Sequence, residues 1–203
     1  TRPPGNREMR AMAKWLVARP LNGVLVLAAT SSPYLGFLSA ALVVLLVLHD
    51  GIRVAAFKAA GAGLLLAVIG VVVGTPPSVI VAVAIVYWLP AALLATVLAT
   101  TRSLTLTLQV SVLVAVLGML VFFGIVGDPV VFWEAELGAA AEIWRNMGAV
   151  ELADSLTEGQ AMLAAQMTMF IVTLLWTIYA VTLALGYKLF RQLPDETDRF
   201  GRF

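Results

Sequence analysis

The chain has 203 residues, of which 61% are apolar and 12% charged, with a net charge of +1 and a mean hydropathy of +0.97. Soluble domains contain roughly 45–50% apolar and 25% charged residues, so this composition excludes a soluble fold and indicates an integral membrane protein. The lack of cysteine excludes disulfides and thiolate metal sites, and the single histidine, His49, has no second imidazole for a zinc site.

Residues 1–20 form a basic segment with one acid, Glu8. From Met9 onward the pattern is helical, with Trp15 and Leu16 on a face that lacks the charges. A basic amphipathic helix with a tryptophan is typical of the membrane interface, so we expect lipid rather than nucleic acid as its partner. The basic region is long and no small-residue cleavage site follows it, so a cleaved signal peptide is not expected.

The next two apolar runs are short. Leu21–Ser32 is too short to cross ~30 Å of hydrocarbon alone, which takes about 20 residues. We expect it to cross as the continuation of the preceding helix, with a kink at Pro20. A turn at Ser31-Ser32-Pro33 then leads into the second short span, Tyr34–Leu48, which ends at His49-Asp50-Gly51. The two runs predict a shallow or tilted helical hairpin.

The third predicted span is Ile52–Gly74, in which Arg53 and Lys58 are placed to snorkel towards the interface. Small side chains recur along it at a spacing of four, at Ala55, Ala59, Gly63 and Ala67, with Gly70 and Gly74 further on. Small residues in line let a neighbouring backbone approach closely, which favours tight helix packing. A groove for an apolar ligand is the alternative.

The fourth predicted span, Ser78–Thr101, has Tyr87, Trp88 and Pro90 near its middle. A proline there frees the carbonyl four residues back, at Val86, and kinks the helix. A kinked helix with aromatic residues at mid-depth either lines a cavity or packs against its neighbours.

The fifth predicted span is Leu104–Val126, and it carries polar residues. Ser103, Thr107 and Ser111 are spaced by four, and Gln109 lies beside them. Hydrogen bonds between helices explain polar groups in hydrocarbon best, and a lining for a polar substrate is the alternative.

Gly127–Gly159 reverses the composition of the chain. It has seven of the twelve acidic residues and only one basic residue, Arg145. The acids are Asp128, Glu134, Glu136, Glu142, Glu151, Asp154 and Glu158. Such an asymmetry indicates a segment on the far side of a membrane from the basic clusters.

Within this external segment, Asp128-Pro129 is a predicted N-cap followed by a first-turn proline. Apolar residues then recur on one helical face, at Trp133, Leu137, Ala140, Trp144 and Met147. They predict an amphipathic helix on the outer surface, with its aromatic face against lipid or the mouth of the bundle. Ser155-Leu156-Thr157-Glu158 matches a capping box that would start the last helix.

The last predicted helix runs from Leu156 to about Phe190, with Gln166, Thr173 and Thr177 on one stripe. The charged tail, residues 192–203, should be solvated. Six crossings with both ends cytoplasmic place twelve of the thirteen basic residues inside, which satisfies the positive-inside rule. The reverse orientation leaves only one basic residue inside, which violates the positive-inside rule. A five-crossing chain puts the acidic segment and the basic tail on the same side of the membrane, which the charge asymmetry disfavours. We therefore expect residues 127–159 to be periplasmic or otherwise external.

No catalytic, nucleotide-binding or metal motif is present, so we predict a protein that is not an enzyme and has no cofactor. No acidic or basic residue falls at the middle of a predicted span, which disfavours ion-coupled carriers and proton pumps. His49-Asp50 resembles an acid–base couple, but it lies at a predicted loop, where polar residues are expected.

The N-terminal half resembles a family of bacterial membrane proteins, the YybS-like family. The resemblance rests on the hairpin around Ser31-Ser32-Pro33-Tyr34, the run Leu35-Gly36-Phe37-Leu38-Ser39-Ala40 into His49-Asp50-Gly51, and the ending Gly186-Tyr187-Lys188-Leu189-Phe190. That family is distantly similar to the S components of energy-coupling-factor transporters and to the shape-determining membrane protein MreD. The resemblance implies a six-helix bundle in the bacterial inner membrane that binds a small substrate or scaffolds partners. It also implies a longer protein, since members usually extend past the sixth span.

The sequence therefore predicts one all-α membrane domain over residues 1–203, a six-transmembrane-helix bundle with an amphipathic external helix between spans 5 and 6. Our first functional interpretation is a transporter-like bundle that binds a small or lipid-like molecule. The second is a non-catalytic scaffold that recruits cell-envelope membrane proteins. The candidate ligand-binding residues are Trp133, Trp144, Tyr87, Trp88, Gln109 and Gln166.

Overall fold

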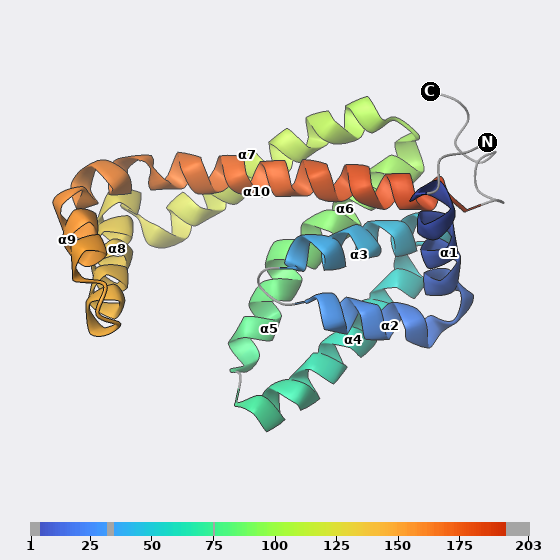
Figure 1. Cartoon of the computed structure of the whole chain (residues 1–203). Coiled ribbons are helices and arrows are strands. Elements are labelled where there is room, and N and C mark those ends of the chain that lie inside the picture. Colours follow the sequence, from blue (N-terminus) through green and yellow to red (C-terminus); the bar gives the residue numbers. More distant parts are fainter. Residues whose placement is uncertain (1–4, 32–34, 75, 194–203) are drawn as a thin grey trace. The chain divides into compact units, whose positions relative to one another are not determined.

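The computed structural model describes residues 5–31, 35–74 and 76–193, and the regular elements in these ranges are all helical (Figure 1). This confirms the predicted all-α class. In chain order the elements are α1 (Gly5–Ala18), α2 (Pro20–Thr30), α3 (Gly36–Asp50), α4 (Ile52–Val73), α5 (Pro77–Val83), the π-helix η1 (Ala84–Trp88), α6 (Leu89–Thr101), α7 (Leu104–Val126), α8 (Pro129–Asn146), α9 (Val150–Glu158) and α10 (Gln160–Phe190).

The chain divides into two compact units. Unit 1 is Thr1–Ser111 together with Ile178–Phe203, and unit 2 is Val112–Thr177. The long helices α7 and α10 each contribute one part to unit 1 and the other part to unit 2. The two units are described separately below, and the assignment of residues 1–203 to one membrane domain stays a prediction.

Four helical segments of the described chain are long and apolar enough to cross a membrane, judged by length and composition. They are Ile52–Val73, Ser78–Thr101, Leu104–Val126 and Gln160–Phe190. The bent pair Ala11–Ala18 and Leu21–Thr30 forms a fifth if it is one broken span, and the apolar helix Gly36–Asp50 is shorter. The chain is therefore a polytopic membrane protein by this measure, and the count of six crossings stays a prediction.

The junction between α1 and α2 is sharper than the kink predicted at Pro20. The two helices are bent by 114°, and Pro20 is the first residue of α2 rather than a residue inside one continuous helix. Proline fits a helix start because its missing N–H has no partner to lose there. The buried face of α1 is formed by Ala13 and Leu16, and Trp15 is exposed. The predicted turn at Ser31-Ser32-Pro33 and the tail beyond Leu193 lie outside the described residues, apart from Ser31.

Helix α3 is the centre of unit 1. Its residues from Ser39 to Leu48 are all buried, and it packs against α2, α4 and α6 (Figure 1). A helix that is apolar on every side needs cover from protein or from lipid, and α3 is covered by protein neighbours over this stretch. Gly186 of α10 also lies against α3, where an added Cβ would be 2.5 Å from the Val44 Cβ and 2.6 Å from the Ala41 carbonyl oxygen.

A π-helical turn precedes Pro90, the residue at which the sequence predicts a kink. Residues 84–88 form η1, and α6 follows with Pro90 in its first turn. π-Turns inside helices often mark functional sites. The Val86 carbonyl, which the proline was predicted to free, accepts a hydrogen bond of 2.9 Å from the Tyr179 hydroxyl of α10. Helix α10 thus supplies this carbonyl with a donor, which Pro90 cannot do because it has no N–H.

Unit 2 contains a helical hairpin of α8 and α9, which lie side by side (Figure 1). The Asp128 side chain accepts hydrogen bonds from the backbone N–H groups of Val130 and Val131, which confirms the predicted N-cap of α8. Leu137 and Ala141 of α8 and Ala153 of α9 form its buried face. Trp144 and Met147, predicted on the apolar face, are 39% and 69% exposed within the chain.

The capping-box prediction is wrong. Ser155 lies inside α9, where its hydroxyl donates to the Glu151 carbonyl, and α10 begins at Gln160. The chain breaks at Gly159 instead, so the acidic segment contains two helices rather than one. The motif occurs here in a helix already begun, where a serine hydroxyl bonds back to the carbonyl one turn earlier.

Candidate functional site

Unit 1 contains an apolar groove with a volume of about 300 Å³. Its ten lining residues come from α3, α4, η1 and α6, and all are apolar: Val43, Val47, Ile52, Ala55, Ala56, Ala59, Ala84, Trp88, Leu89 and Ala92. Val43, Val47 and Trp88 are buried, whereas Ile52 and Leu89 are 44% and 66% exposed. The groove therefore has a buried floor and an open rim, and its volume is at the lower end of ligand pockets.

The groove exists because small side chains face one another across it. Ala55 and Ala59 come from the small-residue stripe of α4, and Ala92 comes from α6. The stripe was expected either to pack tightly or to form a groove; Ala55 and Ala59 line the groove, and of the stripe residues 55, 59, 63 and 67 only Ala55 is fully buried. Further along α4, a Cβ added at Gly63 would be 3.8 Å from the Trp88 ring, an ordinary packing contact.

The Trp88 side chain is held in place by a buried hydrogen bond. Its indole Nε1–H donates to the Ser39 hydroxyl at 3.1 Å, and that hydroxyl donates to the Gly36 carbonyl at 2.8 Å. Both side chains are buried. A tryptophan with a satisfied N–H presents only apolar surface elsewhere, so the groove offers an occupant dispersion contacts without hydrogen bonds.

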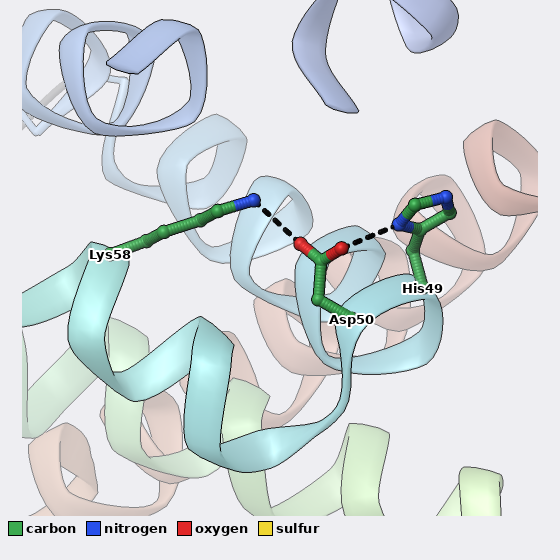
Figure 2. Close-up of polar contacts among 3 residues, drawn as sticks. All are labelled: His49, Asp50 and Lys58. Atoms are coloured by element: carbon green, nitrogen blue, oxygen red, sulfur yellow. Dashed lines mark hydrogen bonds and ion pairs between the residues drawn. The ribbon is translucent and has the colours of Figure 1, made fainter. Parts of the chain in front are cut away.

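An ionic cluster lies at the turn between α3 and α4, beside the residues that end the groove. The Lys58 Nζ is 2.6 Å from one carboxylate oxygen of Asp50, and the His49 Nδ1 is 2.7 Å from the other (Figure 2). The Lys58 and Asp50 side chains are only 8% and 17% exposed. Burial alone would raise the pKa of Asp50, but the hydrogen bonds from Lys58 and His49 outweigh it and lower that pKa, so Asp50 is a carboxylate at neutral pH.

Lys58 was expected to extend to the interface, and the structure gives it a partner inside the protein instead. Its side chain reaches back along α4 to Asp50, as Figure 2 shows. The Lys58 side chain passes α2 at Gly23, where an added Cβ would lie 3.6 Å from the Lys58 Cδ. The sequence predicts His49-Asp50 at a loop where polar residues are expected, and no motif in it links Lys58 to this pair.

The six candidate ligand-binding residues divide between the two units. Tyr87, Trp88 and Gln109 belong to unit 1, whereas Trp133, Trp144 and Gln166 belong to unit 2. Of these residues only Trp88 lines the groove. The Tyr87 ring lies 2.8 Å from the position of a Gly36 Cβ, so it packs on the backbone at the start of α3. Gln109 and Gln166 are exposed.

In unit 2, Trp133 is part of a packed junction between α8 and α10. Its Nε1–H donates to the Thr168 hydroxyl at 2.8 Å, and its ring lies 5.8 Å from that of Phe122 and 5.0 Å from that of Phe132. The Gln160 side-chain amide donates to the Glu134 carbonyl at 2.5 Å. Sequence periodicity missed Thr168 and Gln160, whose partners lie on another helix.

Thr107 and Ser111 were expected to bond to another helix, and both side chains are buried. The Thr107 hydroxyl donates to the carbonyl of Ser103, just before α7, and the Ser111 hydroxyl donates to the Leu108 carbonyl within α7. Serine and threonine hydroxyls in helices commonly bond to carbonyls one turn back. The expectation of bonds between helices at these positions stays a prediction.

Within residues 5–31, 35–74 and 76–193, no group of three His, Cys, Asp or Glu side chains is placed to hold a metal ion. Comparison of the chain with family models, with curated proteins and with solved structures found no match. The site is therefore interpreted from its own geometry.

Proposed function

We propose that this chain is a non-catalytic polytopic membrane protein that binds a lipid-like molecule in the groove of unit 1. The observation that carries the proposal is the composition of the groove, which is about 300 Å³ in volume and lined by ten apolar residues from helices of the candidate spans and from α3. An apolar cavity between membrane helices is accessible to the hydrocarbon around it. An acyl chain fits its chemistry, and a sugar or an ion does not.

The same proposal includes the topology. Six crossings in the inner membrane, with both termini in the cytoplasm, place Arg102 and the α3–α4 turn inside and the α8–α9 hairpin outside. The distribution of basic residues supports this orientation. It is tested by single-cysteine variants, which a chain without cysteine allows directly.

For that test, Arg102→Cys and Glu142→Cys are each treated on intact cells with a membrane-impermeant thiol reagent. Both positions are exposed, so access within the protein is not limiting. We expect labelling at position 142 and none at 102. Labelling at 102 without labelling at 142 would contradict the orientation.

The binding proposal is tested by filling the groove from one wall. Ala59 lines the groove, whereas its neighbour Ala60 is exposed and does not line it. We expect Ala59→Phe to lose most of the lipid that the gently extracted parent protein retains in native mass spectrometry. The matched variant Ala60→Phe should retain it. Ala92→Phe fills the groove from α6 and checks the result with a second, independent substitution.

The scaffold hypothesis gives a different result in the same experiment. A scaffold would carry a stoichiometric protein partner, and its lipid content would be equal in the parent, Ala59→Phe and Ala60→Phe. Equal retention in all three, with each variant melting as a folded protein, would contradict the binding proposal.

A further inference from the structure

The apolar groove alone contributes little free energy to selective lipid binding. An acyl chain that leaves the bilayer for an apolar groove exchanges one hydrocarbon environment for another, so the hydrophobic effect contributes almost nothing. What remains is packing against the groove wall and whatever the protein offers to the polar end of the lipid. Selectivity, if the groove binds lipid as proposed above, must therefore come mainly from the residues beside the end of the groove.

One end of the groove adjoins the α3–α4 turn. Val47 and Ile52 line it, and between and just beyond them lie His49, Asp50 and Arg53. Apolar lining thus gives way to charged and polar side chains within two residues on both helices. A molecule with an apolar tail in the groove would have its polar end at this turn.

The charge at this turn is not balanced. Lys58 and Asp50 form the buried pair at 2.6 Å, which neutralises both. Arg53 follows Ile52 directly, is exposed, and has no ion pair among the described residues. The His49 side chain is 28% exposed, and its Nδ1 is the ring nitrogen that contacts Asp50. The turn therefore presents one uncompensated guanidinium and an imidazole.

We infer that the groove takes a phospholipid with an anionic head group, whose phosphate is bound by Arg53 at the α3–α4 turn, the turn that also carries His49. A guanidinium fits a phosphate because its N–H groups form two parallel hydrogen bonds to the oxygens. The proposed topology puts this turn at the cytoplasmic surface, where anionic lipids give the membrane a negative potential. Asp50 pairs with Lys58 in the structure and not with Arg53, so the charge of Arg53 is left for a ligand.

The experiment compares two lipids that differ only in the head group. Purified protein is equilibrated in detergent micelles with equal amounts of phosphatidylglycerol and phosphatidylcholine of the same acyl chains, and bound lipids are counted by native mass spectrometry. The parent should retain phosphatidylglycerol preferentially, because the quaternary ammonium of phosphatidylcholine makes that head group neutral and opposes its attraction to Arg53. Arg53→Gln should lower that preference about fivefold, the effect of one basic residue near a charged membrane surface. Total lipid bound in the groove should stay the same.

Two controls keep the result specific. Arg53→Lys keeps the charge and should retain most of the preference. Arg102→Gln removes a charge from another exposed helix end that does not adjoin the groove, and should leave the preference unchanged.

Equal retention of both lipids by the parent, or an unchanged preference in Arg53→Gln, would overturn this inference and leave the groove proposal standing. Loss of the preference in Arg102→Gln as well would also overturn it, because the effect would then be one of overall charge. If neither lipid is retained by the parent, or if Ala59→Phe retains as much as the parent, the proposed function itself fails.

Discussion

Unit 1 and unit 2 each contain a salt bridge between helices, and the two are built differently. Lys58–Asp50 in unit 1 has a distance of 2.6 Å and side chains that are 8% and 17% exposed. Arg145–Asp154 in unit 2 has a distance of 3.1 Å and side chains that are 46% and 59% exposed. A buried charge depends on its partner, whereas an exposed charge has water as an alternative. Similar pairs should therefore differ several-fold in their effect on stability.

One helical glycine from each unit shows the same contrast. At Gly186 in unit 1 an added Cβ would collide with the backbone oxygen and side chain of α3, whereas at Gly118 in unit 2 it would meet nothing within 4 Å. In unit 1, α10 thus lies in close contact with α3 at Gly186, whereas α7 has no protein neighbour at Gly118. We expect this contrast in packing to be a contrast in energy as well.

The largest effect is expected for Lys58→Met, which removes the cation and leaves the Asp50 carboxylate buried with only His49. Breaking a buried pair from one side typically costs about 3–5 kcal/mol. Thermal unfolding in detergent should show this as a clear loss of stability, and Lys58→Met combined with Asp50→Asn should recover part of it because no charge is left alone. A single variant that melts like the parent would mean that the pair is solvated in the membrane protein.

Gly186→Ala should have the next largest effect. Its Cβ would lie 2.5 Å from the Val44 Cβ, so α10 or α3 must shift, and overpacking of this kind costs about 1–3 kcal/mol. Gly118→Ala is the matched control, because a helical alanine in open space should stabilise by about 0.5–1 kcal/mol. Melting temperatures that move in opposite directions would support the contrast. A shift of the same sign in both variants would refute it.

The long apolar runs allowed much of the fold to be predicted from sequence. Leu104–Val126 has the predicted boundaries, and Ile52–Val73 ends one residue before the predicted end at Gly74. Hydropathy and length decide such helices without help from tertiary contacts. The Asp128 N-cap was also predictable, because an N-cap bonds only to its own helix.

The groove and the ionic cluster are formed by contacts between helices, and the sequence alone predicts such contacts poorly. The alanine stripe of α4 indicated close packing or a groove, but the second wall comes from η1 and α6, whose placement a periodicity argument does not give. Lys58 and Asp50 are neighbours only because α3 and α4 fold back at Gly51, which has a φ of 83°. Likewise, the capping-box motif at Ser155 was misread because α9 had already begun at Val150.

The smallest effect is expected for Arg145→Gln, which removes the exposed pair of unit 2. Exposed pairs contribute about 0–1 kcal/mol, and salt screens them, so the variant should melt close to the parent and the remaining difference should shrink at high ionic strength. The α8–α9 hairpin should persist because Leu137, Ala141 and Ala153, which are 8%, 3% and 0% exposed, still form its buried face. Hydrogen exchange over α9 in the parent and the variant, at low and high salt, measures this directly.

If Arg145→Gln opened α9 as strongly as Lys58→Met destabilises the whole protein, the hairpin would be held by charge rather than by apolar contact. Exposure would then be a poor guide to the strength of either pair, and the contrast between the two units would no longer hold.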